Sequence, residues 1–191
     1  MSSHHIIREN QEPALWLSSV ETNSESQVLE FLEWSPVLIV DSRCLEFNFK
    51  HGIQADIVIG TPKTKYVEEG LLNSSKICRI NELHGVLKEK NIQSIYQFGK
   101  YSETQLIHPD YKSYIVSLFS NGFQRYSGWH NSEFSKWMVK GTRLIGINED
   151  NLENEAAIEF SEKHNCWTVI RTGICKIQKI QPHQWPGIEM T

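Results

Sequence analysis

Three short polar segments follow predicted strands, and their residue types are ones that bind nucleotides, phosphates or metal ions. The segments are Asp41-Ser42-Arg43, Gly60-Thr61-Pro62-Lys63-Thr64-Lys65 and Gly99-Lys100-Tyr101. Asp41 could bind a ribose hydroxyl or a metal ion, and Lys63 and Lys65 could contact phosphate. Taken singly, each position favours a structural interpretation, because Asp-Ser pairs cap helices, Gly-Thr-Pro forms turns and surface lysines are solvated.

A parallel β-sheet is expected to hold these segments. Residues 37–40 (VLIV) are apolar and β-branched on both faces, as a strand covered by helices on two sides requires. Further short apolar runs lie at residues 14–17, 56–60, 76–80 and 94–98. Residues 26–34 and the segment after Asn81 have helical periodicity, with Ser26 and Asn81 as the expected caps. This alternation predicts a parallel sheet, whose ligands bind outside the carboxyl ends of the strands.

From about residue 111 the pattern changes to short β-branched runs separated by Asn, Asp and Gly, which is typical of antiparallel β-structure. The expected strands are residues 114–119, 134–139, 142–147, 156–160, 166–171 and 174–180. Gly173 is expected to form a tight turn or bulge between the last two strands. We therefore expect a domain boundary near residues 110–125.

Composition argues against several classes of protein. A net charge of −4 gives no basic surface of the kind that nucleic-acid-binding proteins carry. No apolar run is longer than that at residues 37–40, and the amino terminus lacks the apolar core of a signal peptide, which predicts a cytoplasmic protein with no membrane span. The four cysteines form no C-x-x-C pair and are expected to be buried thiols. The histidines lack the spacing of a zinc site, so no metal site is expected from them.

Aromatic residues are concentrated in the second half of the chain. Phe123, Tyr126, Trp129, Phe134 and Trp137 lie within a short stretch. Such a group could stack on a flat heterocycle, with Trp129 and Trp137 as the candidates. The favoured alternative is a role in the core or in a dimer interface.

Residues 37–60, VLIVDSRCLEFNFKHGIQADIVIG, resemble the thiamine pyrophosphokinase family. The matching positions are Asp41 at the end of the first strand, His51-Gly52-Ile53, Asp56 and Gly60. The resemblance implies a divergent bacterial member with an N-terminal Rossmann-like α/β domain and a C-terminal antiparallel β-sandwich. It places the catalytic-type domain at residues 1–115 and the thiamine-binding-type domain at residues 116–191, usually within a homodimer.

The resemblance ends at the acidic motif of the family. Gly-Asp-x-Asp-Ser is replaced by Gly60-Thr61-Pro62-Lys63-Thr64. Diphosphate transfer from ATP requires Mg²⁺ held by carboxylates, and a lysine repels that ion. The resemblance therefore implies Mg²⁺ and ATP as cofactors only if the chain is active.

Three functions stay open. The first is a binding protein with weak or lost diphosphate transfer, in which Lys63 and Lys65 hold a phosphorylated ligand such as a thiamine phosphate or a nucleotide. The second is an active thiamine diphosphokinase with a remodelled metal site. Its carboxylates would come from Asp41, Asp56, Glu68, Glu69 and Glu103. The third is a structural homodimer without ligand. The nucleotide- or phosphate-binding candidates are Asp41, Ser42, Arg43, Asp56, Gly60, Thr61 and Lys63. No catalytic residue is assigned.

Overall fold

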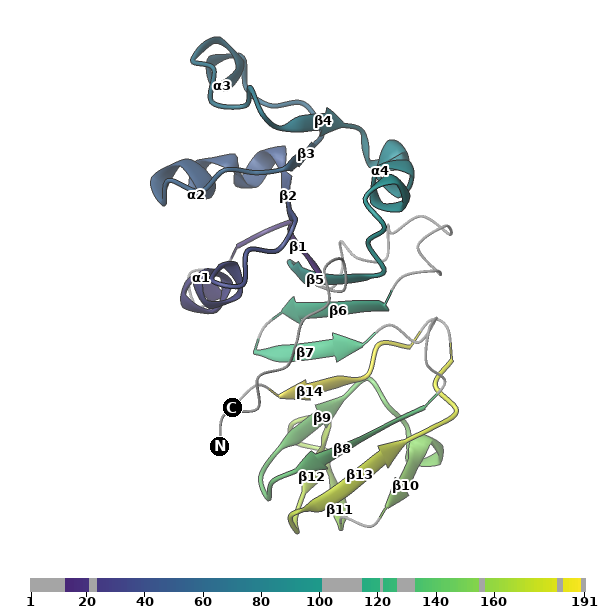
Figure 1. Cartoon of the computed structure of the whole chain (residues 1–191). Coiled ribbons are helices and arrows are strands. Elements are labelled where there is room, and N and C mark those ends of the chain that lie inside the picture. Colours follow the sequence, from purple (N-terminus) through teal and green to yellow (C-terminus); the bar gives the residue numbers. More distant parts are fainter. Residues whose placement is uncertain are drawn as a thin grey trace, which may run out of the picture. The chain divides into compact units, whose positions relative to one another are not determined.

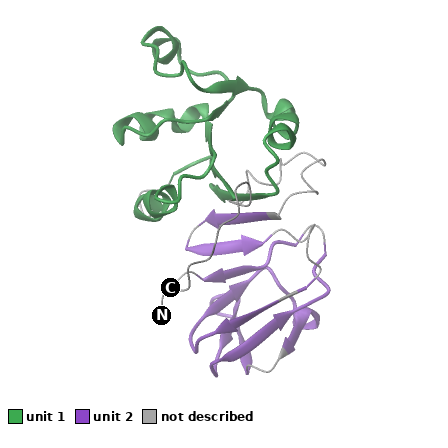
Figure 2. Ribbon diagram, in the orientation of Figure 1, with its two compact units in different colours: residues 1–114 green, residues 115–191 purple. Residues whose placement is uncertain are grey.

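The structure is a computed structural model that describes residues 13–20, 24–100, 115–120, 122–126, 133–154, 157–181 and 184–189. The chain divides into two compact units, residues 1–114 and residues 115–191 (Figure 2). The sequence had indicated a division after residue 115. The two units are described separately below.

The first unit is built on parallel strands in the order β5-β1-β2-β3-β4 (Figure 1). Their bounds are β1 Ala14–Leu17, β2 Leu38–Asp41, β3 Ile57–Ile59, β4 Lys76–Cys78 and β5 Ser94–Phe98. The apolar residues of β1, β2 and β3 are buried throughout, because both faces of these strands are covered. This confirms the parallel α/β architecture expected from the alternation of strands and helices.

Helices cover both faces of this sheet. Their bounds are α1 Glu25–Leu32, α2 Leu45–Lys50, α3 Thr64–Glu68 and α4 Leu83–Glu89. Helices α1 and α2 lie on one face and α4 lies on the opposite face (Figure 1). On the first face, the Phe31 ring packs edge-on against the rings of Tyr96 and Phe98, with centroids 5.2 and 5.7 Å away.

The chain direction creates a switch point between two neighbouring strands. From β1 the chain moves outward through β2, β3 and β4, and it then returns through α4 to place β5 on the other side of β1. The carboxyl ends of β1 and β5 therefore lie at the point where the strand order reverses. Open α/β sheets bind ligands in the crevice at such a point.

Some helix ends differ from the expected ones. Ser24 is the N-cap of α1, and Ser26 lies inside the helix. Asn81 lies within a 3₁₀ turn, Ile80–Glu82, whose N-cap is Arg79. The turn forms because the Glu82 carboxylate accepts a hydrogen bond of 2.7 Å from the Arg79 backbone N–H. Helix α3 was not predicted, because five residues carry too little periodicity to recognise.

The second unit is an antiparallel β-sandwich. One sheet has the order β11-β12-β9-β14-β7-β6, and the other has the order β10-β13-β8. The bounds are β6 Ile115–Ser120, β7 Phe123–Tyr126, β8 Phe134–Met138, β9 Arg143–Ile145, β10 Leu152–Asn154, β11 Ile158–Ser161, β12 Cys166–Val169, β13 Gly173–Ile177 and β14 Gly187–Glu189. Buried residues of both sheets, including Leu144, Val169, Cys175, Ile177 and Ile188, form one core between them.

Three of these strands were missed from the sequence, and one glycine was misassigned. Strands β10 and β14 have three residues each, and β7 lies within the aromatic stretch that was interpreted without a strand. Gly173 does not form a turn or a bulge. It is the first residue of β13 and lies directly opposite Met138 of β8.

The four cysteines are buried free thiols, with Cys44 and Cys78 in the first unit and Cys166 and Cys175 in the second. Burial raises the pKa of the Cys175 thiol to about 11, because a desolvated thiolate is unfavourable.

None of the helices in the described ranges combines the length and the apolar character needed to cross a lipid bilayer.

Candidate functional site

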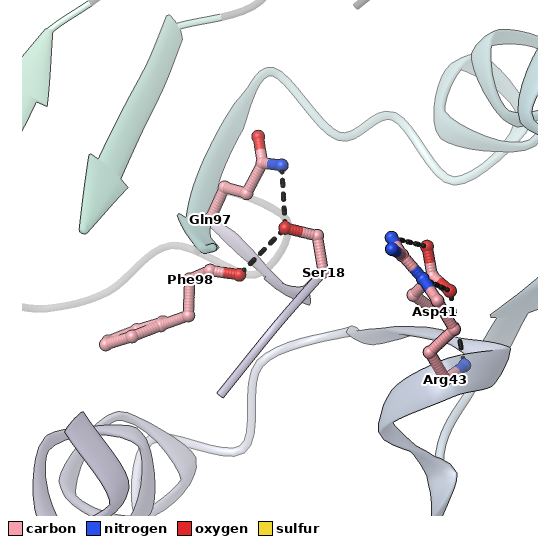
Figure 3. A network of polar contacts seen from close by, with 5 residues as sticks. All are labelled: Ser18, Asp41, Arg43, Gln97 and Phe98. Carbon is pink, nitrogen blue, oxygen red and sulfur yellow. Dashed lines mark hydrogen bonds and ion pairs between the residues drawn. The ribbon is translucent and has the colours of Figure 1, made fainter. Parts of the chain in front are cut away.

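Hydrogen bonds join the carboxyl ends of β1 and β5. The Phe98 carbonyl oxygen accepts bonds from the Ser18 and Ser19 backbone N–H groups at 2.9 and 3.1 Å. It also accepts one from Ser18 Oγ at 2.9 Å, and Ser18 Oγ in turn accepts a bond of 3.1 Å from Nε2 of Gln97 (Figure 3). Because Ser18 and Gln97 are buried, this network fixes the chain at the switch point.

Gly99 allows β5 to pass this close to β1. A Cβ atom at position 99 would lie 1.9 Å from Ser18 Oγ, so any other residue would collide with that hydroxyl. The chain then continues to Lys100, whose side chain is exposed. The close approach therefore brings a cationic side chain to the carboxyl end of β1.

The carboxyl end of β2 carries an ion pair between residues two positions apart. Asp41 caps the 3₁₀ turn Ser42–Cys44, because its Oδ1 accepts a hydrogen bond of 3.2 Å from the Arg43 backbone N–H. The same carboxylate accepts bonds from Nε of Arg43 at 3.0 Å and from Nη2 at 3.1 Å (Figure 3). The guanidinium therefore engages both oxygens of Asp41 in a bidentate pair.

A pocket of about 300 Å³ opens at this edge of the sheet. Its lining includes Ser18, Ser19, Val20, Arg43, Cys44, Phe47 and Lys100. This volume is at the lower end of the range for small-molecule sites. The described lining contributes two cations and no carboxylate, so the pocket attracts anions. Ser19 Oγ is buried and has no hydrogen-bond partner among the described residues, so it is available to a ligand.

The predicted residues at the ends of β2 and β3 are brought together. Asp41 lies beside Ile59 in the register of the two strands. Gly60 follows with a φ of +92°, and a Cβ atom there would lie 3.0 Å from Ser42 Oγ. Ser42 and Gly60 are therefore packed against each other, next to Asp41.

The remaining phosphate candidates do not line the described pocket. Thr61 and Lys63 are exposed in the loop after β3, and Lys63 is the N-cap residue of the short helix α3. Lys65 lies in that helix, with Nζ 4.7 Å from the centroid of the Tyr66 ring.

Asp56 lies at the amino ends of the parallel strands, whereas Asp41 lies at their carboxyl ends. Asp56 precedes β3, and its Oδ2 accepts a hydrogen bond of 2.8 Å from the backbone N–H of Leu38, the first residue of β2. The structure therefore gives Asp56 the role of aligning two strands and does not bring it to the pocket. Glu103 lies outside the described residues.

Of the two aromatic candidates, Trp137 is described and Trp129 lies outside the described residues. Trp137 lies on β8 of the second unit, and its side chain is 64% exposed. It lies opposite Ile174 of β13, which is also exposed. The exposed indole is available to stack on a ligand or on another protein surface.

Four of the lining residues were not predicted from the sequence, namely Ser18, Ser19, Cys44 and Phe47. A usable signal existed for the two serines, because Ser18-Ser19 directly follows the predicted strand at residues 14–17 and so occupies its carboxyl end. Cys44 and Phe47 had no such signal, since apolar and thiol side chains are common in helices that cover a sheet.

The described donor set does not fit Mg²⁺. This ion requires oxygen ligands, usually including carboxylates. Both oxygens of Asp41 are engaged by Arg43, and the next strand is followed by Thr61 and Lys63. Within the described ranges there is also no group of three or more His, Cys, Asp or Glu side chains that could hold a metal ion.

Comparison with known proteins gives a clear result only at the level of structure. No protein-family model matches the sequence. No curated protein is significantly similar to it in sequence.

Solved structures cover nearly the whole chain at low identity. The thiamine pyrophosphokinase from Bacillus subtilis is 10% identical, with a TM-score of 0.57 over 94% of this chain and 99% of that one. A probable thiamine pyrophosphokinase from Staphylococcus saprophyticus is 9% identical, with a TM-score of 0.57 over 94% and 99% of the two chains. The enzyme from Geobacillus thermodenitrificans is 7% identical, with a TM-score of 0.57 over 94% and 98%. The chain therefore has the fold of the thiamine pyrophosphokinases, as residues 37–60 had suggested.

Proposed function

We propose that this chain is a thiamine pyrophosphokinase-like protein that binds a small ligand at the carboxyl edge of its parallel sheet and whose diphosphate transfer is weak or lost. The observation that carries the proposal is the charge of the pocket. Arg43 and Lys100 line it, and the nearby carboxylate of Asp41 is held in a bidentate pair with Arg43. A pocket of this kind favours an anionic ligand over a divalent cation.

The similarity of fold supports thiamine, its phosphates or an adenine nucleotide as the first ligands to test. Isothermal titration calorimetry with each compound should give binding for at least one of them. A Ser19→Trp variant should lose this binding, because the indole would fill the pocket. Ser26→Trp is the matched control, since Ser26 is exposed on α1 and lies outside the described lining. If none of the compounds binds, the proposal is wrong.

Catalysis is tested separately. Purified protein incubated with ATP, Mg²⁺ and thiamine should give little or no AMP and thiamine diphosphate, even at high protein concentration. Turnover at the rate of an ordinary kinase, about 1–100 per second, would favour the active alternative with a metal site built from other carboxylates. Glu68 and Glu69 would then be the first residues to replace.

We also propose that the chain forms a homodimer through the outer face of β8 and β13. Trp137 and Ile174 support this role, because they are cross-strand neighbours that expose 64% and 36% of their surface. Light scattering should give the mass of a dimer for the wild type and of a monomer for Trp137→Glu. Ile170→Glu, at another exposed apolar position of the same unit, should remain a dimer. A monomeric wild type would contradict the proposal.

The same tryptophan is the remaining described candidate for stacking on thiamine. A thiamine-dependent change in tryptophan fluorescence that disappears in Trp137→Leu, without a change of mass, would assign it to ligand binding. A cytoplasmic location stays a prediction, as does the absence of nucleic-acid and membrane partners.

A further inference from the structure

The pocket of the first unit combines features that suit one chemical group. Arg43 and Lys100 supply positive charge, and Ser18 and Ser19 belong to the same lining. We propose that Arg43 and Lys100 bind a phosphate or diphosphate group directly, with no divalent metal, and that Asp41 lowers the affinity of this site. The inference deepens the proposed function, since it names the chemical group that the same pocket recognises.

Arg43 is oriented before any ligand arrives. Its bidentate pair with Asp41 uses Nε and Nη2, at 3.0 and 3.1 Å. Its side chain is 63% exposed although it lines the pocket, so a ligand can reach it. A guanidinium held in this way loses less conformational entropy when it binds an oxyanion.

Lys100 is positioned by the chain geometry at the end of β5. Gly99 packs against Ser18, and the hydrogen bonds among Ser18, Gln97 and Phe98 fix the carboxyl end of β5. Lys100 comes directly after this end. Ser19 Oγ, buried and without a partner in the described part of the chain, adds an uncharged donor beside the two cations. Charge-assisted bonds from a lysine and an arginine, together with a hydroxyl group, are the contacts that phosphate groups usually receive from proteins.

Asp41 is the residue whose role separates direct binding from metal-mediated binding. If a metal ion bridged the ligand, Asp41 would hold that ion and its loss would weaken binding. If the phosphate is bound directly, the carboxylate repels it and competes with it for Arg43. The net charge of the three side chains Asp41, Arg43 and Lys100 is +1 with the carboxylate and +2 without it. Removing the carboxylate should therefore tighten binding.

The experiment is a titration of the full chain with inorganic pyrophosphate by calorimetry, in the presence of EDTA. Binding should be retained in the chelator and should not increase when Mg²⁺ replaces it. Arg43→Gln and Lys100→Gln should each weaken binding by about tenfold to a hundredfold, the usual effect of losing a charge-assisted hydrogen bond. Lys88→Gln is the matched control, because Lys88 is exposed on α4. This variant should bind pyrophosphate with the affinity of the wild type.

The Asp41→Asn variant should change the affinity for pyrophosphate in the opposite direction from the two cation variants. Asparagine is as good a helix cap as aspartate, so the turn Ser42–Cys44 should keep its structure. Pyrophosphate should bind Asp41→Asn several times more tightly than the wild type in EDTA. Weaker binding would overturn the proposal. So would a requirement for Mg²⁺, an unchanged affinity in both cation variants, or the absence of pyrophosphate binding. Circular dichroism and urea unfolding of each variant separate loss of binding from loss of fold.

The outcomes also separate this inference from the proposed function. If thiamine or a nucleotide binds but the cation variants bind it normally, the ligand-binding function stands and the phosphate assignment fails. If pyrophosphate binds in EDTA while thiamine, its phosphates and adenine nucleotides do not, the phosphate site stands and the proposed ligands are wrong.

Discussion

Gly99 and Ser18 approach so closely that a Cβ atom on the glycine would lie 1.9 Å from the serine hydroxyl oxygen. This contact joins the two strands whose ends form the pocket. It also makes any side chain at position 99 energetically costly, although the glycine does not adopt a positive φ. The constraint is therefore a matter of space and not of backbone conformation.

Gly99→Ala should lower the free energy of unfolding by about 1–3 kcal/mol, the usual cost of an extra methyl group in a packed site. Urea unfolding measures the change. In a Ser18→Ala background the cost should fall, because the remaining Ser18 Cβ would lie 3.3 Å away. Gly85→Ala, in helix α4 with no atom within 4 Å, should instead be neutral or add up to about 1 kcal/mol. Equal effects at positions 85 and 99 would contradict the packing explanation.

Two buried asparagines should respond oppositely to the same substitution. Asn48 of α2 is 1% exposed, and neither polar atom of its side chain has a partner among the described residues. Asn48→Leu should therefore raise the free energy of unfolding, by about 1 kcal/mol, because a desolvated and unbonded amide is removed.

Asn151 is the matched case with satisfied hydrogen bonds. Its Nδ2 donates to the carbonyl oxygens of Gln178 and Lys179, and its Oδ1 accepts from the Asn148 backbone N–H at 2.8 Å. Asn151→Leu should cost about 3 kcal/mol, since it leaves the Asn148 backbone N–H without its acceptor and removes a donor from each of the two carbonyl oxygens. A stabilising effect at Asn151, or a large loss at Asn48, would show that the two environments have been interpreted incorrectly.

Acid should weaken the second unit through Glu189. The hydrogen bond from Arg143 lowers the pKa of the Glu189 carboxyl below its ordinary value of 4.5. A lowered folded-state pKa adds stability above the unfolded-state value and loses it as the pH falls through the folded-state value. The free energy of unfolding of the wild type should therefore exceed that of Glu189→Gln at neutral pH. The difference should shrink below pH 4.5. A difference that does not depend on pH would rule out this ion pair as its source.

Alkali should weaken the same unit through Cys175. Burial raises its folded-state pKa to about 11 from an ordinary value of 9.0. The stability that this thiol contributes is complete below pH 9.0 and is lost as the pH rises toward 11. Over this interval the wild type should lose stability faster than Cys175→Ala, as measured by urea unfolding at successive pH values. Parallel curves for the two proteins would contradict the assignment.

The sequence was sufficient to predict a parallel α/β unit followed by an antiparallel β unit, because each has clear local sequence patterns. The apolar run at residues 37–40 became the buried strand β2, and Gly52 ends helix α2 with a φ of +64°, as a left-handed cap should. The short strands β10 and β14 were not predictable. They have three residues each, and their pairing partners β13, β7 and β9 are distant in the sequence.

The site was predictable only in part, for a similar reason. Asp41, Ser42, Arg43 and Gly60 follow strands that the sequence showed clearly, so their shared edge could be inferred. Asp56 was grouped with these residues, although it does not reach the pocket. The sequence pattern alone does not distinguish an aspartate that precedes a short strand from an aspartate that binds a ligand. The bidentate contact between Arg43 and Asp41 depends on side-chain rotamers, which no spacing rule describes.

The ion pair at the end of β2 also has an evolutionary consequence. Its two members are separated by a single residue, so the balance of charge at the pocket is encoded in three consecutive codons. Replacing Arg43 by a neutral residue would leave the Asp41 carboxylate without its counter-ion and would bring the net charge of Asp41 and Lys100 to zero. A single amino-acid replacement at this position would therefore remove the excess positive charge of the pocket without altering the sheet that supports it.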